Sequence, residues 1–271
     1  MTTSNALRAS ATPPIVISDL GPLAGLAGTW VGSGYNLIAV PAQAALFRLI
    51  LNATSDHMTF SPIGGAVPNR GSEQEDIFLH GLTYLQQVSD SQTKAALHIE
   101  PGIWINVPKT VLPQNPSTIV RLATIPHGDS VLAQGLGSTV QGAPVIPSVD
   151  PTPTGAGVTR KYLEPYGTTP LPPGFDIQNP NAALTNAIQG QTISSTVVLQ
   201  VSSTAVDSGI LNIPFITVNA KATKLDATFW IETVEQPGGT PFMQLQYSQT
   251  IILHFFGIDW PHVTVGTLIK Q

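Results

Sequence analysis

Histidine supplies most of the candidate chemistry in this sequence, and His98 with Glu100 forms the first candidate pair. The two residues are two positions apart, so on a β-strand both side chains face the same side. An imidazole and a carboxylate that share a side can ligate a metal ion or hydrogen-bond each other. A catalytic zinc or iron site needs a third protein ligand, and the spacing of the remaining residues identifies none.

His262 is the second candidate. The chain has no cysteine and only three methionines, so a bound iron would take an imidazole ligand. His262 follows Pro261, which fixes the entry angle of the chain, and begins the last predicted strand. By position alone it is more typical of an ordinary exposed histidine. The lack of cysteine also excludes disulfides, zinc fingers and cysteine nucleophiles.

The other histidines and the common catalytic motifs indicate no further site. His127 lies in a Pro-His-Gly-Asp segment that is typical of a turn. His57 and Asp56 are adjacent, so on a strand they point to opposite faces and do not meet. The sequence contains no Gly-x-Ser-x-Gly elbow, P-loop or dinucleotide-binding fingerprint, so nothing indicates nucleophilic or nucleotide-dependent catalysis.

The composition limits the classes of partner. Charged residues make up 10% of the 271 residues, and the net charge is −5. Arg160 and Lys161 form the only basic pair, so we exclude a nucleic-acid partner. The polar N-terminus has no signal-peptide core, and no apolar run approaches about 18 residues. The sequence therefore predicts a cytoplasmic protein without membrane insertion, and it gives no signal for an oligomeric state.

Almost all elements that would position these residues are strands. Residues 1–17 are interpreted as a flexible tail, and residues 18–271 as a single β-barrel domain. A short helix over residues 19–27 is expected to plug one end of the barrel. Residues 141–191 contain 9 of the 24 prolines, a density that excludes central strands. We interpret them as a long insertion between two barrel strands, with one short helix near residues 181–188.

The period-two patterns predict an all-β fold. Expected strands are 30–38, 47–60, 77–88, 94–107, 118–124, 130–139, 192–202, 215–225, 227–235, 242–255 and 263–270. In the strand over residues 242–255, the odd-numbered residues are mostly apolar and the even-numbered residues mostly polar, so one face is buried. An antiparallel up-and-down barrel of about ten strands, as in calycins, is the economical solution because closure removes exposed edges.

Four segments, in the same order, resemble the nitrobindin-type haem-binding β-barrels, a calycin or lipocalin-like family. They are Leu26-Ala27-Gly28-Thr29-Trp30, Leu97-His98-Ile99-Glu100-Pro101-Gly102, Leu122-Ala123-Thr124-Ile125-Pro126-His127-Gly128 and Trp260-Pro261-His262-Val263. The resemblance covers most of residues 20–140 and 192–271. The family has nothing that matches residues 141–191, and this chain has Tyr35-Asn36-Leu37 where the family has Tyr-Pro-Thr.

The resemblance implies a barrel that holds haem b, with His262 as the axial ligand of the iron. It implies nitric oxide binding or peroxynitrite isomerisation as the chemistry. It gives structural roles to Gly28, Trp30, His98 and Glu100, with Trp30 at the barrel floor. Three alternatives stay open. These are a haem-free calycin-type carrier of an apolar molecule such as a fatty acid, an isomerase or cyclase with a converging acid and base, and a structural module without a ligand.

Overall fold

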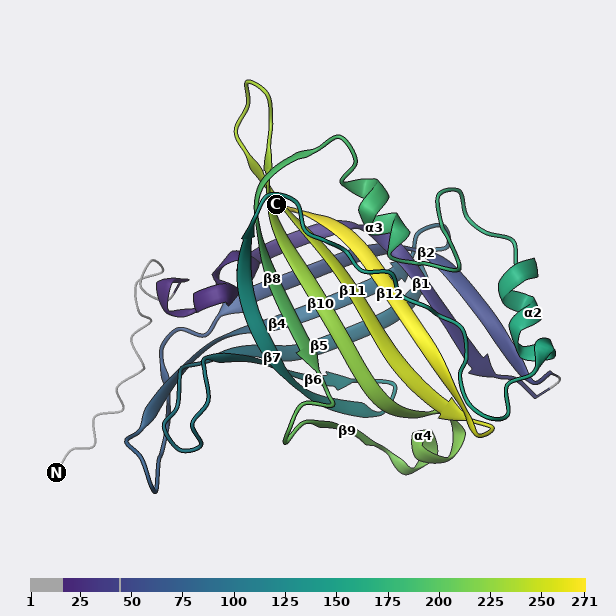
Figure 1. The fold of residues 1–271 in the computed structure, drawn as a ribbon, viewed down its shortest axis with the longest axis horizontal. Helices are drawn as coiled ribbons and strands as arrows, with labels where there is room; N and C mark the ends of the chain where they lie inside the picture. The colour runs from purple at the N-terminus through teal and green to yellow at the C-terminus, as the bar shows by residue number, and fades with distance from the viewer. Residues whose placement is uncertain (1–16, 44) are drawn as a thin grey trace.

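A closed antiparallel barrel dominates the computed structural model, which describes residues 17–43 and 45–271 (Figure 1). The barrel strands are β1 (Gly28–Pro41), β2 (Phe47–Pro62), β4 (Ile77–Asp90), β5 (Ala96–Val107), β6 (Thr118–Ile125), β7 (Asp129–Gln141), β8 (Thr192–Ser202), β10 (Lys221–Glu235), β11 (Phe242–Phe255) and β12 (Ile258–Lys270). Pairing of β2 with β4 closes the ring. The predicted all-β, calycin-like up-and-down barrel of about ten strands is confirmed.

The predicted strand over residues 215–225 is wrong. The chain instead forms a short helix, α4 (Pro214–Asn219), followed by one continuous strand, β10, of 15 residues. Pro214 lies at the first turn of the helix, where its fixed φ and missing N–H are tolerated. The short strands β3 (Val67–Asn69) and β9 (Gly209–Asn212) were not predicted. β9 pairs with β7, beyond the point where β8 ends.

A short helix closes one end of the barrel, as predicted. It is the 3₁₀ helix η1 (Gly21–Leu26), and Leu20, Leu23 and Leu26 are fully buried. Trp30 lies above them and donates a hydrogen bond from Nε1 to the Leu26 carbonyl at 2.7 Å. Residues 1–16, nearly all of the expected tail, lie outside the described residues.

The segment between β7 and β8 runs along the outside of the barrel, as Figure 1 shows for its helices α2 (Arg160–Thr168) and α3 (Ala182–Ala187). The helix expected near residues 181–188 is present, whereas α2 was not predicted. Leu184 packs against Trp230 on the outer face, and Gln246 donates from Nε2 to the Leu184 carbonyl at 2.9 Å. The face of β11 that carries mostly polar side chains is therefore covered by protein over part of its length.

The lumen is filled at the plugged end and becomes polar toward the other end. Near the plug, Trp104 and Phe229 belong to one large apolar cluster.

Gly32 and Gly34 of β1 allow the backbone of β12 to approach closely, because a Cβ at Gly34 would lie 1.9 Å from the Val265 carbonyl oxygen. Among residues 17–43 and 45–271, no helix has the length and apolar character needed to span a bilayer.

Candidate functional site

A chamber of about 270 Å³ lies inside the barrel at the end opposite the plug. Three imidazoles line it, together with four other polar side chains, one threonine and six aliphatic side chains. The lining residues are Asn36, Ile38, Val40, Ile50, Asn52, Gln86, Val88, Leu97, His98, His127, Gln249, Ile251, His262 and Thr264. We call this space the imidazole chamber. Its walls combine six aliphatic side chains with eight polar ones, so apolar surface and hydrogen-bonding groups meet in one space.

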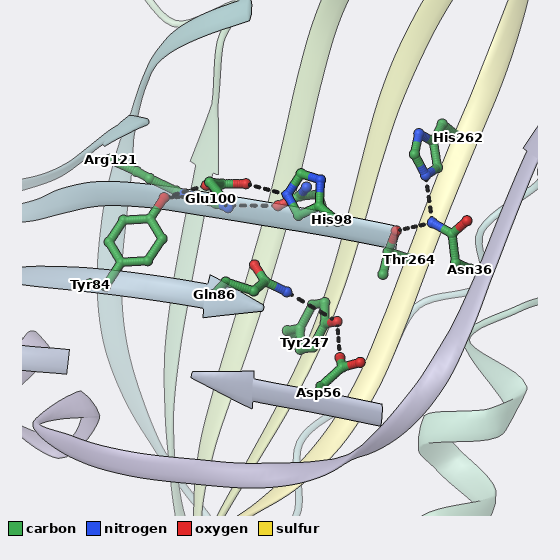
Figure 2. A network of polar contacts seen from close by, with 11 residues as sticks. Asn36, Asp56, Tyr84, Gln86, His98, Glu100, Arg121, Tyr247, His262 and Thr264 are labelled. Carbon is green, nitrogen blue, oxygen red and sulfur yellow. Dashed lines mark hydrogen bonds and ion pairs between the residues drawn. The ribbon is translucent and has the colours of Figure 1, made fainter. Parts of the chain in front are cut away.

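His262 projects from β12 into the imidazole chamber, and Asn36 of β1 fixes its ring (Figure 2). The Asn36 amide nitrogen, Nδ2, lies 2.5 Å from His262 Nε2 and also donates to Thr264 Oγ1 at 2.9 Å. Burial, and then the nearby imidazoles of His98 and His127, lower the pKa of His262 to about 3. His262 is therefore neutral at physiological pH, with Nε2 as an acceptor and its proton on Nδ1.

His98 and Glu100 both face the lumen from β5, and their side chains meet. His98 Nε2 lies 3.2 Å from Glu100 Oε2. Behind this contact, Arg121 Nη2 donates to Glu100 Oε1 at 2.5 Å, and the Tyr84 hydroxyl donates to the same oxygen. Burial works to raise the pKa of Glu100, but Arg121, His98 and Tyr84 outweigh it and hold this pKa at about 2. Glu100 is therefore a buried carboxylate that orients His98.

His127 completes the set of imidazoles. Its predicted turn is present, with Gly128 at φ 117°, but the side chain lines the chamber. The His127 ring stacks on His98 with centroids 5.6 Å apart. Burial, and then His98, lower the pKa of His127. A turn residue that sequence patterns treat as ordinary thus contributes to the chamber wall.

Two glutamines form the floor of the chamber, and the buried polar groups below hold them. Gln249 Oε1 accepts from Arg121 Nη1 at 2.7 Å, which leaves the Gln249 amide nitrogen without a hydrogen bond to any described residue. Gln86 donates to the Tyr247 hydroxyl at 3.3 Å, and that hydroxyl donates to Asp56. Figure 2 shows this chain of contacts crossing the lumen. The floor therefore presents a free amide donor to the chamber.

The other predicted site residues lie away from the chamber. Gly28, at φ 125°, and Trp30 lie at the plugged end, where Lys270 Nζ is 5.3 Å from the Trp30 ring centroid. Asp56 faces the lumen whereas His57 is exposed, which agrees with their predicted opposite orientation. No group of three or more histidine, aspartate and glutamate side chains within the described ranges is arranged to hold a metal ion.

Sequence reasoning missed the polar layer below the chamber. Arg121 is fully buried, and its guanidinium carbon lies 5.5 Å from the centroid of Phe229 and 5.7 Å from that of Trp104. A single arginine within the apolar run Ile119-Val120-Arg121-Leu122-Ala123 was the available signal. A charged residue whose side chain points into the lumen from a barrel strand requires a buried partner, and Glu100 is that partner.

Comparison with known proteins adds little beyond shape. The chain matches no protein-family model and no curated protein. The crystal structure of Rv2717c from M. tuberculosis aligns over 93% of this chain and 97% of that chain, with 16% sequence identity and a TM-score of 0.49. A similarity this distant transfers no ligand or activity. The geometry itself defines the class: a calycin-like antiparallel barrel with a chamber of about 270 Å³ in its lumen, a fold compatible with ligand binding.

Proposed function

We propose that this protein binds a compact, mainly apolar molecule in the imidazole chamber and recognises it by one carbonyl or carboxyl group. A fatty acid of medium length is the model ligand. The observation that carries the proposal is the distribution of polar groups in the chamber. Six aliphatic side chains supply apolar wall, and the polar lining includes two donors, His262 Nδ1–H and the Gln249 amide nitrogen, that have no acceptor among the described residues.

The size of the chamber sets the class of ligand. Pockets for drug-sized molecules measure about 300–1,000 Å³. The chamber, at about 270 Å³, is just below this range and suits a ligand of fewer atoms. Because burial keeps His262 neutral, its N–H binds an acceptor oxygen as a dipole and not as an ion pair.

Calorimetric titration with octanoic acid tests this proposal. Ile251 and Ile252 are neighbours on β11, and Ile251 lines the chamber whereas Ile252 lines an outer-face groove. Ile251→Trp fills the chamber, so we expect octanoic acid to bind at least about tenfold more weakly, a loss of about 1.4 kcal/mol. Ile252→Trp, the matched control, should leave the affinity unchanged. Equal effects of the two substitutions, or no binding to the parent protein, would refute the proposal.

Haem is the second candidate ligand, and one observation favours it: a neutral imidazole, His262, projects into a partly apolar lumen. The donor chemistry fits an axial ligand. The space does not, because a chamber of about 270 Å³ is smaller than drug-sized pockets and its floor is closed by Gln86 and Gln249. His262 Nε2 is also held by Asn36. We therefore derive no nitric oxide or peroxynitrite chemistry from this geometry.

A hemin titration separates the two candidates. The proposal expects no Soret band that depends on His262. A stoichiometric Soret band that is lost in His262→Ala, together with competition by octanoic acid, would show that the chamber opens for a porphyrin. The haem function implied by the sequence resemblance would then replace the compact-ligand proposal.

A further inference from the structure

We propose that the imidazole chamber is also a proton-transfer site, in which His98 acts as a general base on the carbon next to the carbonyl of a bound ketone. His262 donates a hydrogen bond to the carbonyl oxygen in the same step. This inference rests on the proposed function, since it requires the chamber to bind a compact carbonyl compound. It adds an activity, enolisation, and names a substrate class.

The hydrogen bonds of Glu100 determine which nitrogen of His98 is free. Glu100 Oε1 accepts from Arg121 and Tyr84, and its other oxygen, Oε2, faces His98 Nε2 at 3.2 Å. An ionised carboxylate only accepts hydrogen bonds, so Nε2 must carry the proton. A proton that His98 accepts as a base therefore goes to Nδ1, which has no hydrogen-bond partner among the described residues. Orientation of an imidazole by a carboxylate is the arrangement that general-base catalysis requires.

His262 carries its proton on Nδ1, whereas His98 carries its proton on Nε2. Asn36 Nδ2 donates to Nε2 of His262, so the His262 proton lies on Nδ1. A neutral imidazole can polarise a carbonyl by donating this hydrogen bond. Both rings line one chamber, from β5 and β12 respectively. One enclosed space thus contains a base and a hydrogen-bond donor.

The step balances without any other reactant. His98 Nδ1 removes a proton from the α-carbon, and the electron pair of that C–H bond forms a carbon–carbon double bond. The carbonyl π electrons move to the oxygen, where the His262 N–H stabilises the enolate. Glu100 stabilises the imidazolium that forms on His98. Return of a proton from His98 to the α-carbon restores the ketone and His98, so the net reaction is exchange of the α-proton with solvent.

Hydrogen–deuterium exchange tests the activity directly. Methyl hexyl ketone is incubated with the purified protein in D₂O, and proton NMR follows loss of its α-proton signals. We expect exchange faster than in buffer and a decrease of about 100-fold or more in His98→Gln, whose amide still donates to Glu100. His254→Gln is the matched control, because His254 pairs with Asp259 at 2.7 Å on the exposed surface, and it should exchange the ketone at the parent rate.

Two further measurements separate failure of the activity from failure of binding. The affinity for the ketone is measured for the parent and for His98→Gln. Unchanged binding with exchange no faster than in buffer would overturn this inference and leave the proposed function intact, whereas absence of binding of both the ketone and octanoic acid would overturn both. Nitrogen NMR of labelled histidine should show His98 protonated at Nε2 and His262 at Nδ1, and a His98 proton on Nδ1 would contradict the assigned base.

Discussion

Replacing Arg121 with methionine should destabilise the protein severely, because it leaves Glu100 buried without its main partner. The pKa of Glu100 is held at about 2, against 4.5 for a free glutamate, a difference equivalent to about 3 kcal/mol. Removal of one partner of a buried ion pair typically costs about 3–5 kcal/mol, which agrees in magnitude. We therefore expect Arg121→Met to lower the free energy of unfolding by about 3 kcal/mol or more at pH 7.

The pH dependence of this effect has a definite sign. The pKa of Glu100 is depressed by folding, so its stabilising contribution is present above the unfolded value. It is lost as the pH falls from about 4.5 toward about 2. In Arg121→Met the cause of that depression is gone. The difference in stability between parent and variant should therefore shrink as the pH is lowered through this window.

Urea unfolding followed by tryptophan fluorescence measures both effects, with Arg70→Met as the matched control. Arg70 pairs with Asp76 at 2.5 Å, but its side chain is 82% exposed, so its loss should cost less than about 1 kcal/mol. The double variant Arg121→Met with Glu100→Leu should recover part of the loss, because apolar residues can replace a buried ion pair. If Arg121→Met costs no more than Arg70→Met, the reasoning about the buried polar layer is refuted.

Three further predictions concern the barrel wall and floor. Burial raises the pKa of Asp56 to about 6 from 3.8, so its contribution to stability should fall by about 3 kcal/mol as the pH rises from about 4 to about 6. Asp56→Asn should remove this pH-dependent loss of stability, which urea titrations at several pH values would measure. An unchanged dependence of stability on pH would contradict the raised pKa of Asp56. Gly34→Ala should lower the melting temperature strongly, because the new Cβ would lie 1.9 Å from a carbonyl oxygen, whereas Gly65→Ala, with open space around it, should not. Trp30→Ala should lower the free energy of unfolding by about 3–5 kcal/mol in urea titrations. A loss below about 1 kcal/mol would exclude a structural role for Trp30 at the plugged end of the barrel.

Local sequence patterns predicted most of the wall of the barrel. The two strands predicted as 192–202 and 242–255 have the bounds that the structure gives to β8 and β11. Long alternating strands are readable because a period of two is set by the pleat itself. The segment around Pro214 was wrong because residues 215–225 also have a strand-like composition. The structure instead begins α4 at Pro214, whose fixed φ and missing N–H are compatible with the first turn of a helix.

The chamber could be predicted only in part. The pattern placed His98 and Glu100 on one side of a strand, and the structure places both in the lumen. It could not show that β1 brings Asn36 to His262, because that contact joins residues 226 positions apart in the sequence. The size of the chamber also depends on how far the floor side chains fill the lumen, which is a property of packing and not of local pattern.

A crystal structure of the protein with octanoic acid would show where the ligand binds. We expect the acid inside the imidazole chamber, with its alkyl chain against Ile251 and a carboxyl oxygen about 3 Å from His262 Nδ1. The groove of about 730 Å³ between the outer face of the barrel and the proline-rich segment is the competing location. Density for the acid in that groove, with the chamber empty, would show that the imidazole chamber is not the binding site.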